Sequence, residues 1–325
     1  MLLSLCACSF SASKKDPDPD VNLPSNEDLQ EEVDPTANGD SEENPGIEEM
    51  IEEYHKNSSR DVRAYLFLGI DVADPSAGAG RNDGIYIVAI DNDRKTANIL
   101  QLNRDTYTDI VLPDSNGNGF TTVKDRLALA FTTGAGVADS CINAEQTISR
   151  LLHGLKFDGY IVLYYDAIAP VVDTVGGVDI TMEDDMTAIS PDFVQGATLH
   201  LDGNGAYKFC RARTAVGDQA NSGRMRRQRA FLGSFIGVCR TQVKERSSII
   251  NDIYNAASPY IVSDLSASEL CNIGVKALSY GYGGIVSPAG REDWIIGDDG
   301  IRFNIFTVDE NSLSGILKDL FALEK

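Results

Sequence analysis

Short apolar runs alternate with amphipathic stretches from about residue 60 to the carboxyl end of the chain. Runs such as "RAYLFLGID", "GIYIVAID" and "TANILQLN" are rich in β-branched and aromatic residues, and each ends in polar residues, as buried strands do. Several of the stretches between such runs have the periodicity of helices. This alternation predicts an α/β sandwich built around one mixed sheet.

The same pattern locates the individual elements. Further strands are expected over "FDGYIVLYY", "VDITM", "GGIVSPAG", "DWIIG" and "IRFNIF". Helices are expected over 123–132, over "NAEQTISRLLHG" with Asn143 as N-cap, over "DAIAPVVDTVGG", which ends at a glycine pair, and over 203–213, 222–246, 267–280 and "DENSLSGILKDLFAL".

The amino-terminal part of the chain has a different composition. Residues 1–60 contain 15 Asp and Glu against 4 Lys and Arg, and so contribute -11 to the formal net charge of -21. Residues 13–60 also contain five prolines and few apolar residues, which predicts a disordered acidic stalk. Its last part, "GIEEMIEEYHKN", has the composition of a short helix that leads into the domain. We therefore predict a signal or lipobox remnant (1–12), a stalk (13–60) and one catalytic domain (61–325).

The first residues, "MLLSLCACSFSASKK", contain only a short apolar stub before Cys8, less than a secretory signal needs. "LCAC" followed by serine-rich sequence resembles a bacterial lipobox, with Cys8 as the acylated residue. The alternative is a chance cysteine pair at a wrongly assigned start. No later stretch approaches the roughly 18 apolar residues of a membrane span. We therefore expect an extracytoplasmic protein that is attached to the membrane at this end.

The other four cysteines, Cys141, Cys210, Cys239 and Cys271, lack the spacing of a metal site. They have the number to form two disulfides, in any of three pairings. We favour the alternative that they are small buried hydrophobic residues, because none lies in a loop-rich context.

Acidic and basic residues follow the predicted strands at the positions where α/β folds build their sites. The first strand ends in Asp71, "GRND" (80–83) opens the second, and "NRDT" (103–106) follows the third. The carboxylates of Asp71 and Asp83 suit Mg²⁺, which takes one or two carboxylates together with phosphate oxygens and water. The alternative is that Asp71 caps a turn and Arg81 pairs with Asp83 at the surface.

A second cluster of charge lies in "RARTAVGDQANSGRMRRQRA" (211–230), which contains six arginines and a single acid, Asp218. On a helix that begins at Ser222, residues follow one another at about 100° around the axis. Arg224 and Gln228 then fall within the apolar face. The members of that face are Phe231, Leu232, Phe235, Val238 and Cys239; Arg227 lies at its edge, and Arg226, Arg229 and Arg240 point away.

An inward guanidinium needs an anion, and the amino end of a helix also favours negative charge. Arg211 and Arg213 lie at the end of the helix expected over 203–213. The glycine-containing loop between this helix and the next can bring them towards Arg224. This set suits a pyrophosphate or two phosphates, with a structural ion-pair cluster as the alternative. The acidic balance of the chain argues against a nucleic-acid surface.

Taken in order, the blocks "YLFLGID", "GRNDGIYIVAID", "ILQLNRDTYTDI", "FDGYIVLYYDAIAPVVDTVGGVDI", "LHLDGNGAYKFCRAR" and "SGRMRRQRAFL" resemble the LytR-CpsA-Psr family across roughly residues 62–240. The resemblance implies a three-layer α/β/α sandwich that encloses a tunnel for a polyprenyl chain. It also implies an enzyme outside the cytoplasmic membrane of a chiefly Gram-positive bacterium. Such enzymes move teichoic acid or capsular polysaccharide from a polyprenyl-pyrophosphate carrier to peptidoglycan.

By position in the family blocks, Asp71 and Asp83 would be the Mg²⁺ ligands, and Arg104 and Asp105 would lie nearest the chemistry, with the general base unassigned. The residues implied around the pyrophosphate are Arg81, Arg104, Lys124, Arg211, Arg213, Arg224 and Gln228. The chain departs from the family pattern at Ala73, where an arginine is frequent, and at Arg126 and Leu129 in the block of Lys124. These departures weaken the assignment of Lys124.

Three functions follow from these observations. The first is Mg²⁺-assisted transfer of the glycopolymer, in which a sugar hydroxyl attacks the pyrophosphate. The second is binding or hydrolysis of polyprenyl pyrophosphate without transfer. The third is a DNA-binding transcriptional attenuator, which the acidic composition and the export-like amino end oppose.

Overall fold

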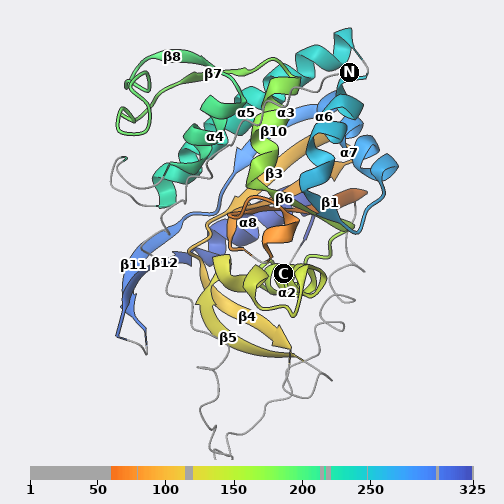
Figure 1. Cartoon of the computed structure of the whole chain (residues 1–325). Coiled ribbons are helices and arrows are strands. Elements are labelled where there is room, and N and C mark those ends of the chain that lie inside the picture. Colours follow the sequence, from red (N-terminus) through yellow and green to blue (C-terminus); the bar gives the residue numbers. More distant parts are fainter. Residues whose placement is uncertain are drawn as a thin grey trace, which may run out of the picture. The chain divides into compact units, whose positions relative to one another are not determined.

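Six strands form a mixed sheet at the centre of the computed structural model (Figure 1). The structure describes residues 60–323 except 79, 114–119, 213–215, 217–220, 247 and 298–299. The strand order is β10 (Gly281–Val286), β3 (Thr96–Leu102), β2 (Asn82–Asp91), β1 (Val62–Ile70), β6 (Gly159–Tyr164) and β9 (Ile261–Ser263). β1 is antiparallel to β2 and parallel to β6, so the predicted mixed sheet is confirmed. The predicted stalk lies outside the described residues.

Helices lie on both faces of this sheet (Figure 1). Along β1, Leu66, Leu68 and Ile70 are fully buried in one core. Phe67 and Gly69 point to the other face, because successive side chains of a strand alternate. The first face packs against α2 (Val137–Leu151) and α8 (Glu310–Phe321). The second faces α3 (Ile168–Thr174), α5 (Asn221–Glu245), α6 (Ile249–Ala257) and α7 (Ala267–Ser279), with α4 (Gly203–Arg211) packed against α3 and α5.

Three antiparallel hairpins extend from this layered body (Figure 1). They are β4 (Tyr107–Pro113) with β5 (Phe120–Arg126), β7 (Val178–Thr181) with β8 (Thr198–Leu201), and β11 (Gly290–Ile296) with β12 (Arg302–Val308). Four short 3₁₀ helices complete the described elements: η1 (Pro75–Ala77), η2 (Leu127–Thr132), η3 (Tyr165–Ala167) and η4 (Ser258–Tyr260). None of the helices in the described ranges is long and apolar enough to span a bilayer.

The predicted helix over 123–132 is wrong. β5 continues to Arg126, and only Leu127–Thr132 is helical, as η2. The cause is the hairpin, in which every residue of β5 pairs with a residue of β4, and this long-range pairing overrides the local periodicity. The N-cap assigned to Asn143 is also wrong: α2 begins at Val137, and Asn143 is buried inside it, where its Nδ2 donates to Thr133 Oγ1 at 3.0 Å.

Within the described residues, the other predicted helices and strands are present with small shifts of their ends, whereas α6, β4, β8 and β9 were not predicted. The short helix predicted over "GIEEMIEEYHKN" lies outside the described residues. β8 and β9 contain only four and three residues, too few to show an alternating pattern. Cys141, Cys210 and Cys239 are buried, Cys271 is half-buried, and all four are free thiols, in agreement with the favoured interpretation.

We predict that Leu68→Ala lowers the free energy of unfolding by about 3 kcal/mol, because it empties space in a filled core. Phe67→Ala, one residue away, should cost less than about 1.5 kcal/mol, because Phe67 is only half-buried and borders a cavity that already exists. Equilibrium unfolding in urea measures both values, and equal losses would contradict the assignment of the two faces.

Candidate functional site

The candidate site lies at one edge of the sheet, where four strands bring their polar ends together. β1 and β6 run in parallel and both end here, with Ile70 paired to Tyr164, so Asp71 and Tyr165 are the first residues beyond them. β2 is antiparallel to β1 and begins at this edge with Asn82 and Asp83. β3 ends at the same edge and leads into the segment 103–106. Neighbouring strands thus collect the residues that the sequence motifs contain.

Asp83 lies between two buried arginines. Arg104 Nη1 donates to Asp83 Oδ1, and Arg224 Nη1 donates to Asp83 Oδ2 at 2.7 Å. Each arginine is only 2% exposed. Burial lowers the pKa of Arg104, whereas for Arg224 the opposing effect of burial is outweighed by Asp83 and nearby Tyr165, which raise its pKa. One carboxylate thus binds two cations, one from the segment after β3 and one from α5.

Two asparagines link Arg224 to the segment after β3. Asn221 Oδ1 accepts from Arg224 Nη2 at 2.8 Å and from Nε at 3.2 Å. Asn221 Nδ2 donates to Asn103 Oδ1 at 2.7 Å, which also accepts the backbone N–H of Asp105 at 2.9 Å. Sequence reasoning missed both asparagines, although Asn103 belongs to the "NRDT" motif and Asn221 stands at the start of α5. Their roles depend on a contact between distant segments.

Asp71 forms the second carboxylate–arginine contact of the site. Its Oδ1 accepts the backbone N–H of Arg81 at 2.7 Å, and its Oδ2 accepts Arg81 Nε at 3.0 Å. The side chain of Arg81 remains 24% exposed, which makes this pair more accessible than the contacts of Asp83. Asp71 therefore stands at the outer part of the site.

The first turns of α5 place Arg224 and Gln228 inward, as the helical pattern predicts, since these residues are 2% and 7% exposed. Arg227 is buried as well, and it donates to Asp184 Oδ2 at 3.0 Å and to the carbonyl of Ala212 at 2.6 Å. Arg226 is exposed and pairs with Glu183 and Asp184. Asp83 and Asp184, from other parts of the chain, thus supply counter-charges that the local sequence lacks.

The prediction that Arg229 and Arg240 point away from the molecule is wrong. Arg229 Nη1 donates to Gln101 Oε1 at 3.1 Å and to Ser287 Oγ at 3.0 Å, and Arg240 Nη1 donates to the carbonyl of Tyr280 at 2.6 Å. The physical reason is that α5 packs along β10 and α7, so a second side of the helix is also in contact with protein. Arg226 alone of the three faces solvent.

The remaining predicted residues lie in different places. Arg211 is exposed at the end of α4, where its Nη1 donates to Tyr207 Oη at 2.5 Å. Its guanidinium carbon lies 5.3 Å from the ring centroid of Tyr165 and 5.5 Å from that of Tyr207. Arg213 lies outside the described residues. Lys124 is exposed on β5, with its Nζ 3.9 Å from Asp109 Oδ1, and no contact among the described residues joins it to Asp83.

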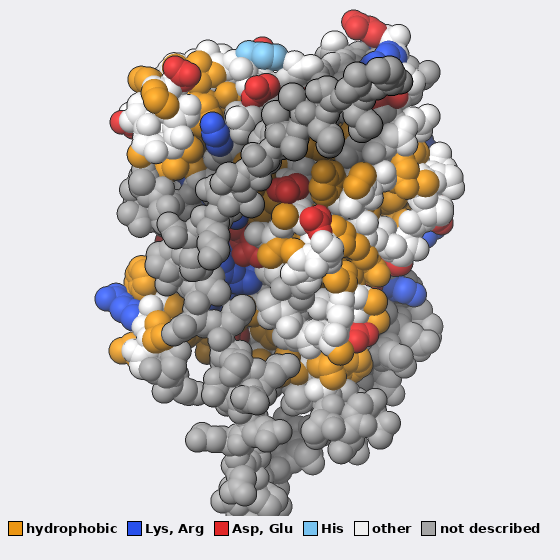
Figure 2. All heavy atoms as spheres, viewed as in Figure 1, with side chains coloured by type: hydrophobic (Ala, Val, Ile, Leu, Met, Phe, Trp, Pro, Cys, Tyr) orange, Lys and Arg blue, Asp and Glu red, His pale blue; other side chains and the backbone are white. Residues whose placement is uncertain are grey.

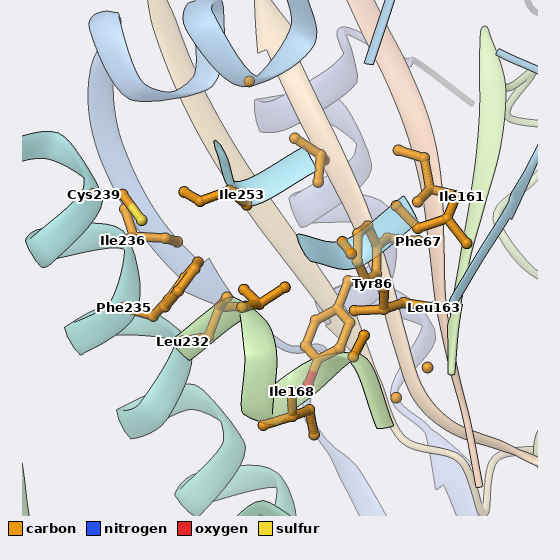
Figure 3. Close-up of a pocket in the computed structure, with 18 of the residues that line it drawn as sticks. Phe67, Tyr86, Ile161, Leu163, Ile168, Leu232, Phe235, Ile236, Cys239 and Ile253 are labelled. Carbon is orange, nitrogen blue, oxygen red and sulfur yellow. The ribbon is translucent and has the colours of Figure 1, made fainter. Parts of the chain in front are cut away.

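An apolar cavity of about 430 Å³ (Figure 3) includes in its lining Gln228, which follows Arg224 by about one turn of α5. It lies between the sheet, which contributes Phe67, Ile161 and Leu163, and the helices. The lining residues of α5 are Gln228, Phe231, Leu232, Phe235, Ile236 and Cys239. Tyr86, Tyr165 and Gln228 are polar residues of the lining, and Tyr86 Oη donates to Gln228 Oε1 at 3.4 Å. An apolar chain in the cavity would therefore end near buried arginines.

Several buried polar atoms at the site have no hydrogen-bond partner among the described residues. They are both side-chain atoms of Asn82, Nε of Arg104 and Oδ1 of Asp105, the last two 3.7 Å apart. Each buried unpaired group costs about 1–3 kcal/mol. Such a cluster is typical of a site that completes its hydrogen bonds with a ligand.

The chemistry of Asp71 and Asp83 fits a divalent cation. A carboxylate oxygen has two lone pairs, so it accepts more than one partner. Two carboxylates are the protein ligands that Mg²⁺ takes when a phosphate and water supply the rest. No group of three or more His, Cys, Asp or Glu residues suited to a metal occurs among the described residues, so the substrate would have to complete the shell.

The LytR_cpsA_psr family model matches residues 25–314 of the chain. A polyisoprenyl-teichoic acid–peptidoglycan teichoic acid transferase TagU from Bacillus mycoides is 29% identical over 181 residues, which cover 56% of this chain and 54% of the relative. A polyisoprenyl-teichoic acid–peptidoglycan teichoic acid transferase TagV from Bacillus subtilis is 24% identical over 210 residues, which cover 63% of this chain and 50% of the relative. The chain thus spans about half the length of these curated relatives. A solved structure of TagT bound to LI-WTA has a TM-score of 0.59 at 22% identity, over 81% of this chain and 90% of that one, and supports the fold.

We predict that Asp83→Asn lowers the free energy of unfolding by about 3 kcal/mol, because it leaves Arg104 and Arg224 buried without their counter-charge. Asp71→Asn should cost about 1 kcal/mol, since Arg81 is partly solvated. Inorganic pyrophosphate should raise the midpoint of thermal unfolding more for Asp83→Asn than for the wild type, because the anion replaces the lost carboxylate. An equal effect of pyrophosphate on both proteins would contradict an anion site at these arginines.

Proposed function

Because the chain belongs to the LytR-CpsA-Psr family, we propose that it transfers an anionic glycopolymer from a polyprenyl-pyrophosphate carrier to peptidoglycan. The polymer is a teichoic acid or a capsular polysaccharide. The observation that carries the proposal is the apolar cavity next to a cluster of buried arginines. An isoprenoid pyrophosphate has the same division into an apolar chain and a compact polyanion.

Each part of the site has a role in this proposal. The cavity between the sheet and α5, α6 and α7 takes the polyprenyl chain and removes its surface from water. Arg104 and Arg224 bind phosphate oxygens, and the exposed Arg211 contacts the anion from the solvent side. Asp83 keeps the two buried arginines charged and positioned before the substrate arrives. Gln228, at the boundary, accepts a hydrogen bond from Tyr86 through its Oε1, and its Nε2 donates to the phosphates.

The reaction is a displacement at the phosphorus that carries the glycan. A hydroxyl oxygen of the acceptor sugar forms a bond to that phosphorus, and the bond to the bridging oxygen breaks. The electron pair stays on the released polyprenyl monophosphate, and the proton of the hydroxyl leaves to a base that is not assigned. Arg104, with the neighbouring Asp105, lies nearest the reacting atoms in this proposal, and the arginines stabilise the charge that develops on the phosphate oxygens.

Mg²⁺ is the proposed cofactor, with Asp71 and Asp83 as its ligands. It would neutralise phosphate charge and hold the two phosphates in a fixed orientation. Because arginines already engage both carboxylates, the affinity for the ion alone should be low and should rise when phosphate takes over the arginines' hydrogen bonds.

The enzyme would work on the outer face of the cytoplasmic membrane, where the carrier lipid presents its glycan. Cys8 is the proposed site of lipid attachment, and peptidoglycan is the proposed acceptor. A transcriptional regulator fits the site less well. Figure 2 shows Lys and Arg side chains interspersed with Asp and Glu on the face that is drawn, and the chain has a formal net charge of -21.

The second candidate function is binding or hydrolysis of the same lipid without transfer. It uses the same cavity and the same arginines, and water takes the place of the acceptor hydroxyl. Release of polyprenyl monophosphate from the lipid-linked glycan in the absence of acceptor would favour hydrolysis, and retention of intact lipid would favour binding.

We predict that the purified protein joins a polyprenyl-pyrophosphate-linked glycan to a peptidoglycan acceptor when Mg²⁺ is present. Arg224→Ala should lower the rate about 100-fold, because it removes a buried donor to the phosphates. Arg226→Ala, two residues along the same helix, removes an exposed arginine and should retain the rate within about twofold. Absence of transfer by the wild type, or full transfer by a folded Arg224→Ala protein, would refute the proposal.

A further prediction concerns Mg²⁺. Titration calorimetry should show weak binding of Mg²⁺ to the free protein and stronger binding after saturation with a polyprenyl pyrophosphate. Asp71→Asn should remove this gain while the lipid still binds, because Asp71 has no contact with Arg104 or Arg224 among the described residues. The same Mg²⁺ affinity with and without the lipid would show that the two carboxylates do not form the metal site.

A further inference from the structure

Tyr165 occupies the boundary between the apolar cavity and the charged cluster. It is the first residue of η3, directly after β6, and its backbone N–H donates to the carbonyl of Val72 at 3.3 Å. This contact fixes it beside Asp71 at the edge of the sheet. Its side chain is 8% exposed and forms part of the cavity wall. Neither the motifs nor the family blocks singled it out as a site residue.

The ring of Tyr165 has a clear structural role. The guanidinium of Arg211 lies over it at 5.3 Å, and the ring of Tyr207 meets it edge-on, with centroids 6.3 Å apart at an interplanar angle of 73°. Tyr207 also accepts the hydrogen bond from Arg211. The rings of Tyr165 and Tyr207 therefore hold the exposed Arg211 in place at the end of α4.

The hydroxyl of Tyr165 has no such structural role, because it has no hydrogen-bond partner among the described residues. Tyr86, which lines the same cavity, differs in this respect, since its hydroxyl donates to Gln228. A phenol keeps its proton at neutral pH, so this hydroxyl is a hydrogen-bond donor. Tyr165 lies in the wall of the cavity, close enough to Asp83 and Arg224 to interact with them electrostatically.

We propose that the Tyr165 hydroxyl donates a hydrogen bond to the phosphate that remains on the polyprenyl chain. This inference rests on the proposed function and adds a contact that selects the phosphorylated end of the lipid. A chain that lies in the cavity brings its first phosphate to the cavity's polar boundary, where this donor stands. The same bond stabilises the leaving phosphate, which gains the electron pair when the bridging bond breaks, and no proton needs to be transferred.

The test uses two probes of equal chain length, geranylgeranyl monophosphate and geranylgeraniol, which differ in the phosphate. Tyr165→Phe keeps the ring, and with it the contact to Arg211. It should weaken binding of the monophosphate about tenfold, the loss of one hydrogen bond to a charged group, and change binding of the alcohol less than twofold. Tyr160→Phe removes a hydroxyl from β6, the strand that precedes Tyr165, at a residue outside the cavity lining. It serves as the control, with both affinities unchanged.

Equal affinities of Tyr165→Phe and the wild type for the monophosphate would overturn the inference. An equal loss for phosphate and alcohol would also overturn it, because it would show that the hydroxyl only shapes the cavity. Both outcomes differ from failure of the proposed function, in which the wild-type protein itself neither binds the monophosphate nor transfers the glycan. In the transfer reaction, Tyr165→Phe should lower kcat about tenfold as well.

Discussion

The contact of Asp83 with Arg104 and Arg224 is the constraint on which the rest of the site depends. Two guanidinium groups that are removed from water require a nearby anion, because an unpaired buried charge costs several kcal/mol. One carboxylate has two oxygens, and each takes one arginine. The triad therefore joins the start of β2, the end of β3 and the first turn of α5, three segments that local structure alone would not bring together.

This junction also determines where the cavity begins. Because the amino end of α5 is fixed to the sheet edge through Asp83 and Asn221, the following turns of the helix lie over the sheet face that α2 and α8 leave free. The polar and apolar parts of the site are thus consecutive parts of one helix. Charge pairing at one end and burial of hydrophobic surface along the rest stabilise the same position of α5.

Most helices and strands, and the inward direction of Arg224 and Gln228, can be predicted from the sequence, because they follow from local periodicity. The acidic partner of each arginine cannot be predicted from the sequence. Asp184 and Asp83 lie about 40 and 140 residues before α5's arginines, and the contacts depend on tertiary packing. The helix expected at 123–132 shows the same limit, since the pairing of β5 with β4 decides that structure. Lys124 is consequently exposed on this hairpin, where its Nζ lies 3.9 Å from Asp109 Oδ1.

The residues of α5 that line the cavity, from Gln228 to Cys239, recur at intervals of three and one along the chain. An α-helix rises 1.5 Å per residue, so this stretch extends about 16 Å from Gln228. Inserting a single residue would rotate everything beyond it by about 100° and turn the second half of the lining away from the cavity. The depth of the cavity therefore changes only in steps of a whole helical turn. Homologous proteins with deeper or shallower cavities should differ in α5 by three, four or seven residues and not by one or two.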